Sequence, residues 1–323
     1  MSRKSRDHRS APVPSVRQVA VSDEEDGRRL DNFLLARLKG VPRAHVYRLI
    51  RSGQVRVNGG RAGPQQRLES GNLVRIPPVR TASETGFRAA ANGDVGWLES
   101  RVLIEDEDLI VLDKPAGLAV HGGSGVALGA IELLRLLRPD CRSLGLVHRL
   151  DRETSGCLLV AKRESGLRRL QAQFREGSTE KQYLALMHGR LPRGGSLVDA
   201  ALLTTERRGG ERHVRVDPAG KPSLTRFEPV ERFEHSTLAR VTLLTGRTHQ
   251  IRVHAAHIGM PLVGDERYGQ LPDAVAEAGE LRKRLFLHAT SLSFQHPREP
   301  RRIEAASEIP ADLAACLSRL RRA

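Results

Sequence analysis

The stretch that decides the fold is Gly145-Leu-Val-His-Arg-Leu-Asp-Arg-Glu-Thr-Ser-Gly-Cys-Leu-Leu-Val-Ala-Lys162, a polar loop between two short apolar runs. The runs predict a strand on each side of the loop. One carboxylate, Asp151, lies in the loop between Arg149 and Arg152, and neighbouring positive charge favours the ionised form of a carboxylate. Loops held by rigid strands often carry catalytic groups, although a salt-bridged turn would give the same pattern.

The composition indicates a partner rich in negative charge. The net charge is +15 and the pI is about 10.8, which favours nucleic acid as the partner before an anionic membrane surface. Of the 53 basic residues, 46 are arginine. Arginine suits bidentate contact with phosphates, although a GC-rich genome would produce the same bias.

Several features argue against a membrane or secreted protein. The sequence has no apolar run long enough for a transmembrane helix, and its basic N-terminal stretch lacks the apolar segment of a signal peptide. The three cysteines fit neither a disulfide framework nor a zinc site, and we expect them to be packing residues; they are Cys141, Cys157 and Cys316. We therefore expect a cytoplasmic protein with no membrane partner.

The chain divides into four parts by its pattern. Residues 1–21 are polar and basic and predict a disordered tail. Residues 22–78 predict a small domain of two helices followed by strands, with Asn58-Gly59 as a hairpin turn. Residues 79–97 lack periodicity and predict a linker, and residues 98–323 predict a second, strand-rich domain with few helices.

Five further strings in the second domain could carry chemistry. They are K-P-A-G (114–117), K-Q-Y-L-A (181–185), T-G-R-T-H-Q-I-R-V-H (245–254), G-M-P-L-V-G-D-E-R-Y-G (259–269) and R-L-F-L-H-A (284–289). The first is no phosphate-binding loop of the G-x-x-x-x-G-K-[ST] kind, and Tyr183 alone would suggest a core aromatic residue. We predict no metal site, because the spacing of His249, His254 and His257, in and just after the third string, matches no zinc pattern and no cysteine or acidic ligand lies nearby.

Together these strings resemble a known family. H-R-L-D-R-E-T-S-G followed by L-L-V-A-K resembles the central motif of the RluA-type pseudouridine synthases, and the five strings resemble its other motifs. The segments R-L-D-N-F-L, L-I-R-S-G-Q-V-R-V-N-G and L-E-S-G-N-L-V-R-I resemble an S4 RNA-binding domain, except that Asn72 stands where that family usually has Asp.

The resemblance implies a fold and an activity. The fold would be α+β, with a mixed, largely antiparallel sheet crossed by a central cleft and a small α-L-like S4 domain at the N-terminal side. The enzyme would be an isomerase that converts uridine in RNA to pseudouridine without a cofactor. The resemblance is nearest to members acting on 23S ribosomal RNA, so we expect free rRNA or the assembling large subunit as partner, and a monomer.

The resemblance also assigns roles to residues. Asp151 would be the catalytic carboxylate, Arg252 would hold it ionised and aimed, and Tyr183 would lie under the base as a candidate proton acceptor. Arg149 would fill the space left by an extruded uridine or hold a phosphate. Weaker candidates for contacts with RNA are Lys114, Arg247, Arg37, Arg43, Arg48 and Arg51.

Two alternatives stay open at this point. A non-catalytic S4-type ribosome assembly factor would explain the charge, but it would leave Asp151, Tyr183 and Arg252 without a role. Activity in a fragment that begins near residue 98 would distinguish the two. A carbohydrate hydrolase could use Asp151 with Glu153, but carboxylates two residues apart in a loop do not normally face each other across a bond.

Overall fold

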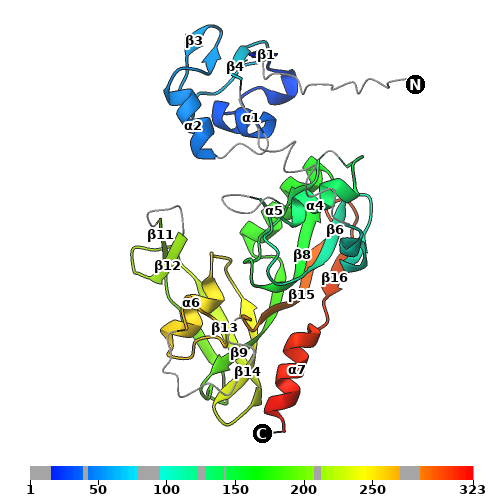
Figure 1. Ribbon diagram of the computed structural model, residues 1–323, viewed down its shortest axis with the longest axis vertical. Helices are drawn as coiled ribbons and strands as arrows, with labels where there is room; N and C mark the ends of the chain where they lie inside the picture. The colour runs from blue at the N-terminus through cyan, green and yellow to red at the C-terminus, as the bar shows by residue number, and fades with distance from the viewer. Residues whose placement is uncertain are drawn as a thin grey trace, which may run out of the picture. The chain divides into compact units, whose positions relative to one another are not determined.

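The computed structural model describes residues 16–38, 43–78, 95–122, 128–141, 143–206, 212–269 and 284–322. The chain forms two compact units (Figure 1). The first unit holds the described residues up to 78, and the second holds nearly all of those from 95 onward.

The first unit packs two helices on a four-stranded antiparallel sheet with strand order β1-β4-β2-β3. Its elements are β1 (Arg17–Ala20), η1 (Asp23–Glu25), α1 (Leu30–Arg37), α2 (Arg43–Arg51), β2 (Arg56–Val57), β3 (Gly60–Arg61) and β4 (Leu73–Ile76). The predicted turn between β2 and β3 is confirmed, because Asn58 and Gly59 both have positive φ, 49° and 82°. Such a pair matches the right-handed twist of a hairpin.

Strand β1 corrects the predicted boundary of the tail. Residues 17–20 pair with β4, with Arg17 opposite Ile76 and Ala20 opposite Leu73. The sequence predicts disorder here because the surrounding residues 1–21 are polar and basic. Residues 17–20 are ordered because they pair with the edge of β4. This partner lies far along the chain, so the sequence of the segment itself does not reveal it. The rest of the predicted tail up to residue 15 lies outside the described residues.

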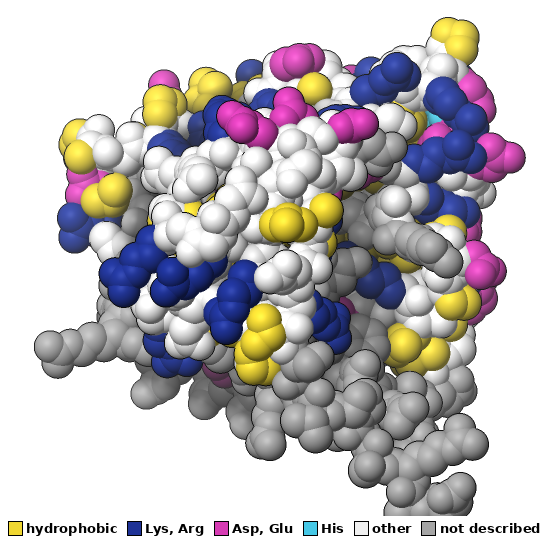
Figure 2. Space-filling view, turned by 90° about the horizontal axis from the view of Figure 1, so that it is seen from above, with side chains coloured by type: hydrophobic (Ala, Val, Ile, Leu, Met, Phe, Trp, Pro, Cys, Tyr) yellow, Lys and Arg dark blue, Asp and Glu magenta, His cyan; other side chains and the backbone are white. Residues whose placement is uncertain are grey.

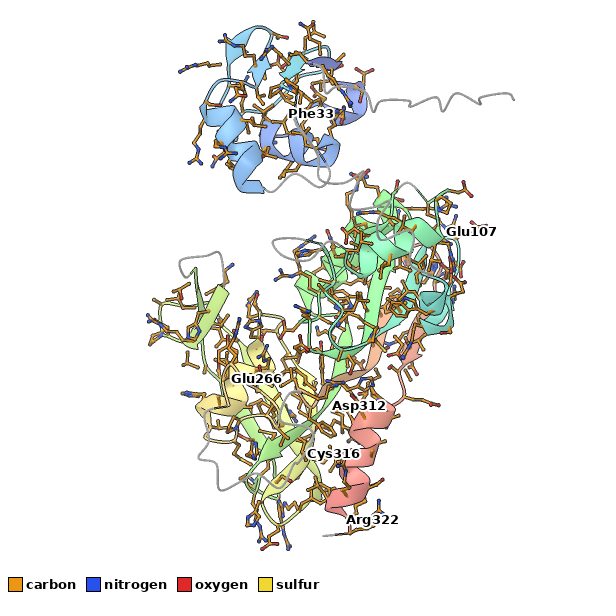
Figure 3. The ribbon with its side chains drawn as sticks, viewed as in Figure 1. Phe33, Glu107, Glu266, Asp312, Cys316 and Arg322 are labelled. Carbon is orange, nitrogen blue, oxygen red and sulfur yellow. The ribbon has the colours of Figure 1, made fainter. Side chains whose placement is uncertain are left out.

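An ion pair lies beside the core of the first unit. Phe33, labelled in Figure 3, is fully buried among aliphatic side chains of both helices and the sheet. The guanidinium of Arg37 lies 3.6 Å from the centroid of this ring and donates two hydrogen bonds, of 2.7 and 2.6 Å, to Glu25. The pair therefore joins α1 to η1 at the edge of the core.

We expect this pair to make the stability of the first unit depend on pH. The bonds from Arg37 lower the pKa of Glu25 from 4.5 to about 2. A carboxyl with a lowered folded pKa stabilises the fold above its unfolded pKa, and this contribution, about 2 kcal/mol, disappears as the pH falls from about 4.5 to 2. Thermal unfolding of the Glu25→Gln variant should depend less on pH in that range. The exposed Glu69→Gln variant serves as control, and equal pH slopes for all three proteins would contradict the prediction.

The second unit is built on a ten-stranded sheet, with the order β10-β13-β14-β9-β15-β8-β6-β5, and with β16 on β15 and β7 on β8. Every pair is antiparallel except β15 with β8. The strands are β5 (Val102–Glu105), β6 (Leu109–Lys114), β7 (Gly145–Leu146), β8 (Ser155–Ala161), β9 (Glu180–His188), β10 (Ser196–Asp199), β13 (Leu224–Arg232), β14 (Ser236–Leu243), β15 (Leu287–Gln295) and β16 (Arg302–Ala306). The mixed, largely antiparallel sheet is therefore confirmed.

Helices and a separate hairpin surround this sheet (Figure 1). They are η2 (Gly96–Arg101), α4 (Ala130–Leu137), α5 (Glu164–Glu176), the hairpin of β11 (Leu202–Glu206) and β12 (Arg212–Val216), α6 (Gln250–His257) and α7 (Ala311–Leu320). Val95 packs against the core of this unit and η2 begins at Gly96. The second domain thus begins slightly before the predicted end of the linker, and residues 79–94 lie outside the described part of the chain.

A close approach of two strands fixes the loop that contains Asp151. Strands β8 and β15 pair at only two positions, Ser155 with His288 and Gly156 with Ala289. Gly156 has φ of +108°, and a Cβ atom there would overlap the backbone of Ala289. Only glycine allows this approach without strain, so the end of the loop is anchored to the middle of the sheet.

The C-terminal helix packs on the sheet. Leu313, Cys316 and Leu317 of α7 are buried against Leu186 and Phe286, and Figure 3 labels Cys316 on this helix. Cys157 is also buried, whereas Cys141 is partly exposed. Among the described residues, no helix combines the length and the apolar character needed to cross a bilayer.

Candidate active site

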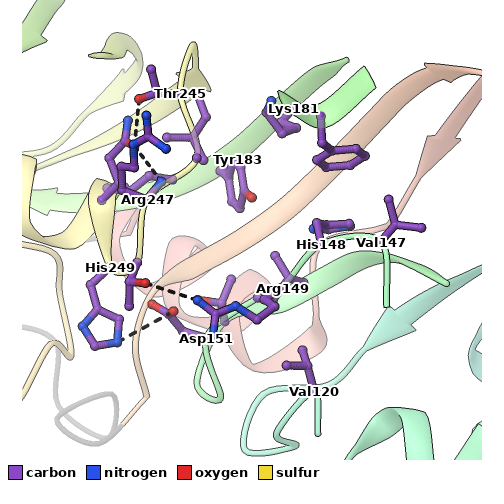
Figure 4. A pocket seen from close by; sticks show the side chains of 18 of the residues that line it. Val120, Val147, His148, Arg149, Asp151, Lys181, Tyr183, Thr245, Arg247 and His249 are labelled. Carbon is purple, nitrogen blue, oxygen red and sulfur yellow. Dashed lines mark hydrogen bonds and ion pairs between the residues drawn. The ribbon is translucent and has the colours of Figure 1, made fainter. Parts of the chain in front are cut away.

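A cleft of about 1130 Å³ crosses the second unit beside the Asp151 loop (Figure 4). Residues 146–152 line it, together with part of α5, Lys181 and Tyr183 from β9, and residues 243–252, which connect β14 to α6. The loops and helices are far apart in sequence, and the sheet brings them together. This is the central cleft that the family resemblance implies.

Asp151 lies in this cleft with its side chain 24% exposed. Its Oδ2 atom is 3.5 Å from Nη1 of Arg252, and its Oδ1 atom is 3.8 Å from Nε2 of His249. The loop is tightened by a hydrogen bond of 3.1 Å from the Thr154 N–H to the Asp151 carbonyl oxygen. Each carboxylate oxygen therefore faces one basic side chain, while the carboxylate remains accessible.

Arg252 is held mainly by a second carboxylate. Its Nε and Nη2 atoms donate hydrogen bonds of 2.8 and 2.7 Å to Asp265, whose side chain is fully buried. Asp265 also accepts the backbone N–H groups of Arg267 and Tyr268. Burial alone would raise the pKa of Asp265, but the bonds from Arg252 lower it below its usual value. Arg252 thus reaches Asp151 from a fixed position, as its predicted role requires.

His249 also lies in the cleft, although the sequence suggests for it only the role of a metal ligand. It precedes α6 with a left-handed backbone, φ 54° and ψ 20°. Its Nδ1 atom lies 2.7 Å from the Tyr268 hydroxyl. Burial lowers the pKa of His249, although the charge of Asp151 opposes this, so the ring is neutral near pH 7. Non-glycine residues in such a conformation often lie at functional sites.

Tyr183 lies on β9 in the middle of the sheet, opposite Val241 of β14 and Ala289 of β15. It is 7% exposed and lines the cleft. Burial raises the pKa of Tyr183 well above its usual value, and the negative charge of Asp151 raises it further. The phenol therefore carries its proton in the resting enzyme.

The two arginines predicted for the cleft are both there. Arg149 is exposed, and its Nη2 atom donates a hydrogen bond of 3.3 Å to Thr248 Oγ1, which joins the Asp151 loop to the segment before α6 (Figure 4). Arg247 is exposed on that segment, and its Nε donates to the carbonyl oxygen of Pro222 at 3.3 Å. Both residues line the cleft.

Lys114 does not have the position expected of a phosphate ligand. It is fully buried, and its ammonium donates to three carbonyl oxygens, those of Pro115 (3.0 Å), Leu118 (2.9 Å) and Arg152 (3.1 Å). Burial lowers its pKa to about 7, while the charge of Asp151 opposes the shift. We infer that Lys114 is structural, because it ties the Asp151 loop to the K-P-A-G turn. The K-P-A-G string does not by itself predict that the Lys114 side chain is buried.

Lys181 is a cation of the cleft that is not among the predicted site residues. Lys181 is 8% exposed, and its ammonium donates to Thr179 Oγ1 at 3.1 Å and lies 5.5 Å from the ring centroid of Phe174. His148 stacks on the same ring with 4.8 Å between centroids. The K-x-Y spacing could have indicated this position. Residues i and i+2 of a strand point to the same face, so Lys181 lies on the same side of β9 as Tyr183.

The arginines predicted to contact RNA in the first unit differ in their surroundings. Arg37 is paired with Glu25 and packs on the ring of Phe33, and its side chain is 27% exposed. Arg48 and Arg51 are exposed on α2. The side chain of Arg43 lies outside the described residues.

The three histidines considered for a metal do not meet. His254 is fully buried, with Nε2 2.9 Å from the carbonyl oxygen of Ala200 and Nδ1 2.9 Å from Thr225 Oγ1. His257 is exposed at the end of α6. Since His249 lies in the cleft, these residues provide no common set of ligands.

A different cluster, Asp106, Asp108 and His296, has suitable donors within 4.8 Å of one another. However, Nδ1 of His296 accepts the backbone N–H groups of Arg298 and Glu299, at 3.2 and 2.9 Å. The ring hydrogen must then lie on Nε2, which faces Asp106 at 3.2 Å. A metal would need the lone pair of that nitrogen, so the cluster is an ion-pair network.

The hydrolase alternative lacks its second carboxylate. Glu153 lies 3.6 Å from Arg152 and is not among the residues that line the cleft. Within the described part of the chain, the carboxylates lining the cleft are Asp151 and Glu176. Glu176 lies at the far end of α5. A pair of carboxylates flanking one glycosidic bond is therefore not formed by Asp151 and Glu153.

Comparison with known proteins decides between the remaining alternatives. A family model described as RNA pseudouridylate synthase matches residues 108–257, and a model of the S4 domain matches residues 28–74. The ribosomal large subunit pseudouridine synthase C of Escherichia coli (strain K12) is 49% identical over 316 residues, covering 96% of this chain and 98% of that protein. The protein of the same name from Yersinia pestis is 49% identical over 310 residues, covering 96% and 97%. The chain belongs to the RNA pseudouridine synthase family.

Solved structures support the fold of this synthase. Human RNA pseudouridylate synthase domain containing 1 is 27% identical with a TM-score of 0.56, covering 69% of this chain and 89% of that one. Human RNA pseudouridylate synthase domain containing 4 has a TM-score of 0.59 at 24% identity, covering 73% and 97%. The predicted family, fold class and S4 domain are therefore confirmed, and the synthase is an isomerase rather than a binding protein alone.

Proposed function

We propose that this synthase converts uridines of 23S ribosomal RNA to pseudouridine, with Asp151 as its catalytic carboxylate. The observation that carries the assignment is the accessible carboxylate of Asp151, which faces Arg252 and His249 in a cleft that Tyr183 also lines. Its relatives over nearly the whole chain are named for the large ribosomal subunit, which supports that substrate.

The reaction breaks the bond between N1 of uracil and C1′ of ribose and forms a bond from C5 to C1′. The C5 proton leaves and N1 is protonated, so the reaction is an isomerisation that needs no cofactor. The uridine must first leave its stack, since stacked bases hide both reacting atoms. Asp151 would then attack C1′ or C6, or stabilise charge at C1′. Arg149 would fill the vacated stack or hold a phosphate, and Arg247 would contact a phosphate.

Tyr183 provides an aromatic surface for the base and a hydroxyl close to Asp151. The charge of Asp151 contributes to the raised pKa of Tyr183, so this contribution vanishes once the carboxylate is bonded to the substrate. The phenol then ionises more readily: once it has given its own proton to solvent, the phenolate can accept the C5 proton in a late step.

We expect Tyr183→Phe to slow the chemical step by about 10- to 100-fold and to leave RNA affinity nearly unchanged. Phenylalanine keeps the ring surface and loses only the hydroxyl. Single-turnover rates and equilibrium binding to the same rRNA fragment would separate the two effects. If affinity alone fell, the residue would be a stacking platform.

The first unit would add affinity for phosphates. The chain carries a net charge of +15, and Figure 2 shows Lys and Arg side chains gathered in groups on one face, with acidic side chains between them. Replacing both Arg48 and Arg51 by alanine should weaken binding similarly for all RNA sequences. It should also reduce the slope of log K against log salt by about 1 to 2. An unchanged slope would show that α2 does not contact phosphate.

His249 and Arg252, which face Asp151, belong to the same chain as Asp151, and a monomer is the form that we propose. The reaction would take place in the cytoplasm, on free 23S rRNA or on the assembling subunit. No step calls for a membrane.

The test is tritium release from 23S rRNA labelled with 5-³H-uridine, with labelled 16S rRNA as the control substrate. We expect release from 23S rRNA only, followed by mapping of the modified uridines. Release from 16S rRNA alone would overturn the substrate assignment. Binding to both RNAs without any release would favour the non-catalytic alternative.

A further inference from the structure

The turn at residues 265–268 holds both side chains that face Asp151. Asp265 binds Arg252, and Tyr268 contacts His249 at 2.7 Å. The Tyr268 ring also packs 5.2 Å from the Arg252 guanidinium carbon. Accepting the proposed function, we propose that His249 is a positioning residue: a neutral imidazole that donates its Nε2 hydrogen to Asp151 Oδ1, with Tyr268 selecting the tautomer that makes this possible.

The hydrogen bonds around Tyr268 fix the tautomer. Its oxygen accepts the backbone N–H of Val214 at 3.3 Å. Among the described residues, the hydroxyl has no acceptor within hydrogen-bond distance other than Nδ1 of His249. In the proposed arrangement the hydroxyl donates to Nδ1, and the ring hydrogen of the neutral imidazole then lies on Nε2. That hydrogen is on the side that faces Asp151.

The backbone keeps the ring in this position. The left-handed conformation of His249 costs free energy and persists only if its neighbours enforce it. Gln250, which is buried, does so: its Oε1 accepts Thr245 Oγ1 and the N–H of Arg247, both at 2.9 Å, and its Nε2 donates to Leu224 and Thr225. These hydrogen bonds hold the turn before α6 in one conformation. The strained backbone of His249 in turn sets the direction in which its ring points.

The two donors would together aim the carboxylate. Arg252 faces Oδ2 and His249 faces Oδ1, so rotation of the Asp151 carboxylate is opposed from both sides. The present 3.8 Å from Nε2 to Oδ1 exceeds a hydrogen bond. Catalytic hydrogen bonds are often long without substrate and shorten in the complex. The His249 ring must also be neutral, because a protonated ring would form an ion pair with Asp151 and compete with Arg252 for the carboxylate.

The test compares four variants with wild type in single-turnover tritium release and in equilibrium binding to a 23S rRNA fragment. We expect His249→Leu to lower the rate about 10- to 100-fold while the Kd stays within about twofold. His249→Gln should be faster than His249→Leu, because its amide can place an N–H near the position of Nε2. Tyr268→Phe keeps the ring beside Arg252 and the backbone at residue 249, and it should lower the rate several-fold. His257→Gln, an exposed histidine of the same helix, is the matched control.

Each result bears on the inference. Rates equal to wild type for His249→Leu and Tyr268→Phe would overturn it, and so would losses that appear in Kd rather than in rate, since His249 would then contact RNA. Equal rates for His249→Leu and His249→Gln would also overturn the role of the Nε2 hydrogen. Failure of the proposed function looks different: wild type itself would release no tritium. Melting temperatures identify any variant that is misfolded, and Tyr268→Phe then decides the question, because it leaves the strained residue in place.

Discussion

Asp151→Asn is expected to abolish pseudouridine formation, lowering the single-turnover rate by at least about 10³-fold, while the protein still binds 23S rRNA. Asparagine has almost the same shape, but its amide can neither act as a nucleophile nor offset positive charge at C1′. RNA affinity should stay the same or rise slightly, since the substitution removes a negative charge from a cleft that receives a polyanion. Tritium release and filter binding with the same labelled RNA would measure both quantities.

The matched control for this variant is Glu153→Gln. Glu153 is a carboxylate of the same loop that pairs with Arg152 and does not line the cleft. The Glu153→Gln variant should retain near-normal activity. It loses only an exposed ion pair, which contributes at most about 1 kcal/mol to stability, so the loop should keep its conformation. Substantial activity in Asp151→Asn would remove Asp151 from the mechanism. Equal losses in both variants would instead indicate damage to the loop.

The sequence allowed the reactive part of this site to be predicted because that part is local. Asp151 lies within one continuous string between two strands, and Tyr183 lies within a second string on a third strand. Arg252 was placed by its string as well. Sheet topology then brings these strings together, and the family resemblance supplied that topology in advance. The fold class and the S4 domain were predictable for the same reason.

The surroundings that distant parts of the chain create are what the sequence predicts least. Arg37 and Lys114 are predicted to contact RNA because they are basic. One is paired with Glu25, and the other is enclosed by carbonyl oxygens of two separate loops. His249 was considered only as a metal ligand, since its partners Asp151 and Tyr268 lie far from it in sequence or in another string. A basic side chain in a sequence does not show which acceptors will surround it.

Asp265→Asn is expected to damage both the stability and the activity of this synthase. Asp265 is the bidentate partner of Arg252, and both side chains are buried. Removing one charge of a buried pair leaves the other without compensation, so we expect a loss of about 3 kcal/mol, or roughly 6 to 12 °C in Tm. Activity at a temperature where the variant is folded should fall by about 10²-fold, because Arg252 would turn toward Asp151 and occupy part of the space needed by the substrate.

The control for this effect is a bidentate pair of the same type at the surface. Arg321 donates to both carboxylate oxygens of Glu231, and the two side chains are 52% and 32% exposed. Glu231→Gln should change stability by less than about 1 kcal/mol and leave activity unchanged. If Asp265→Asn lost stability but kept its single-turnover rate, the pair would be structural only. If it kept both, the fixed position of Arg252 would have no bearing on how Asp151 is aimed.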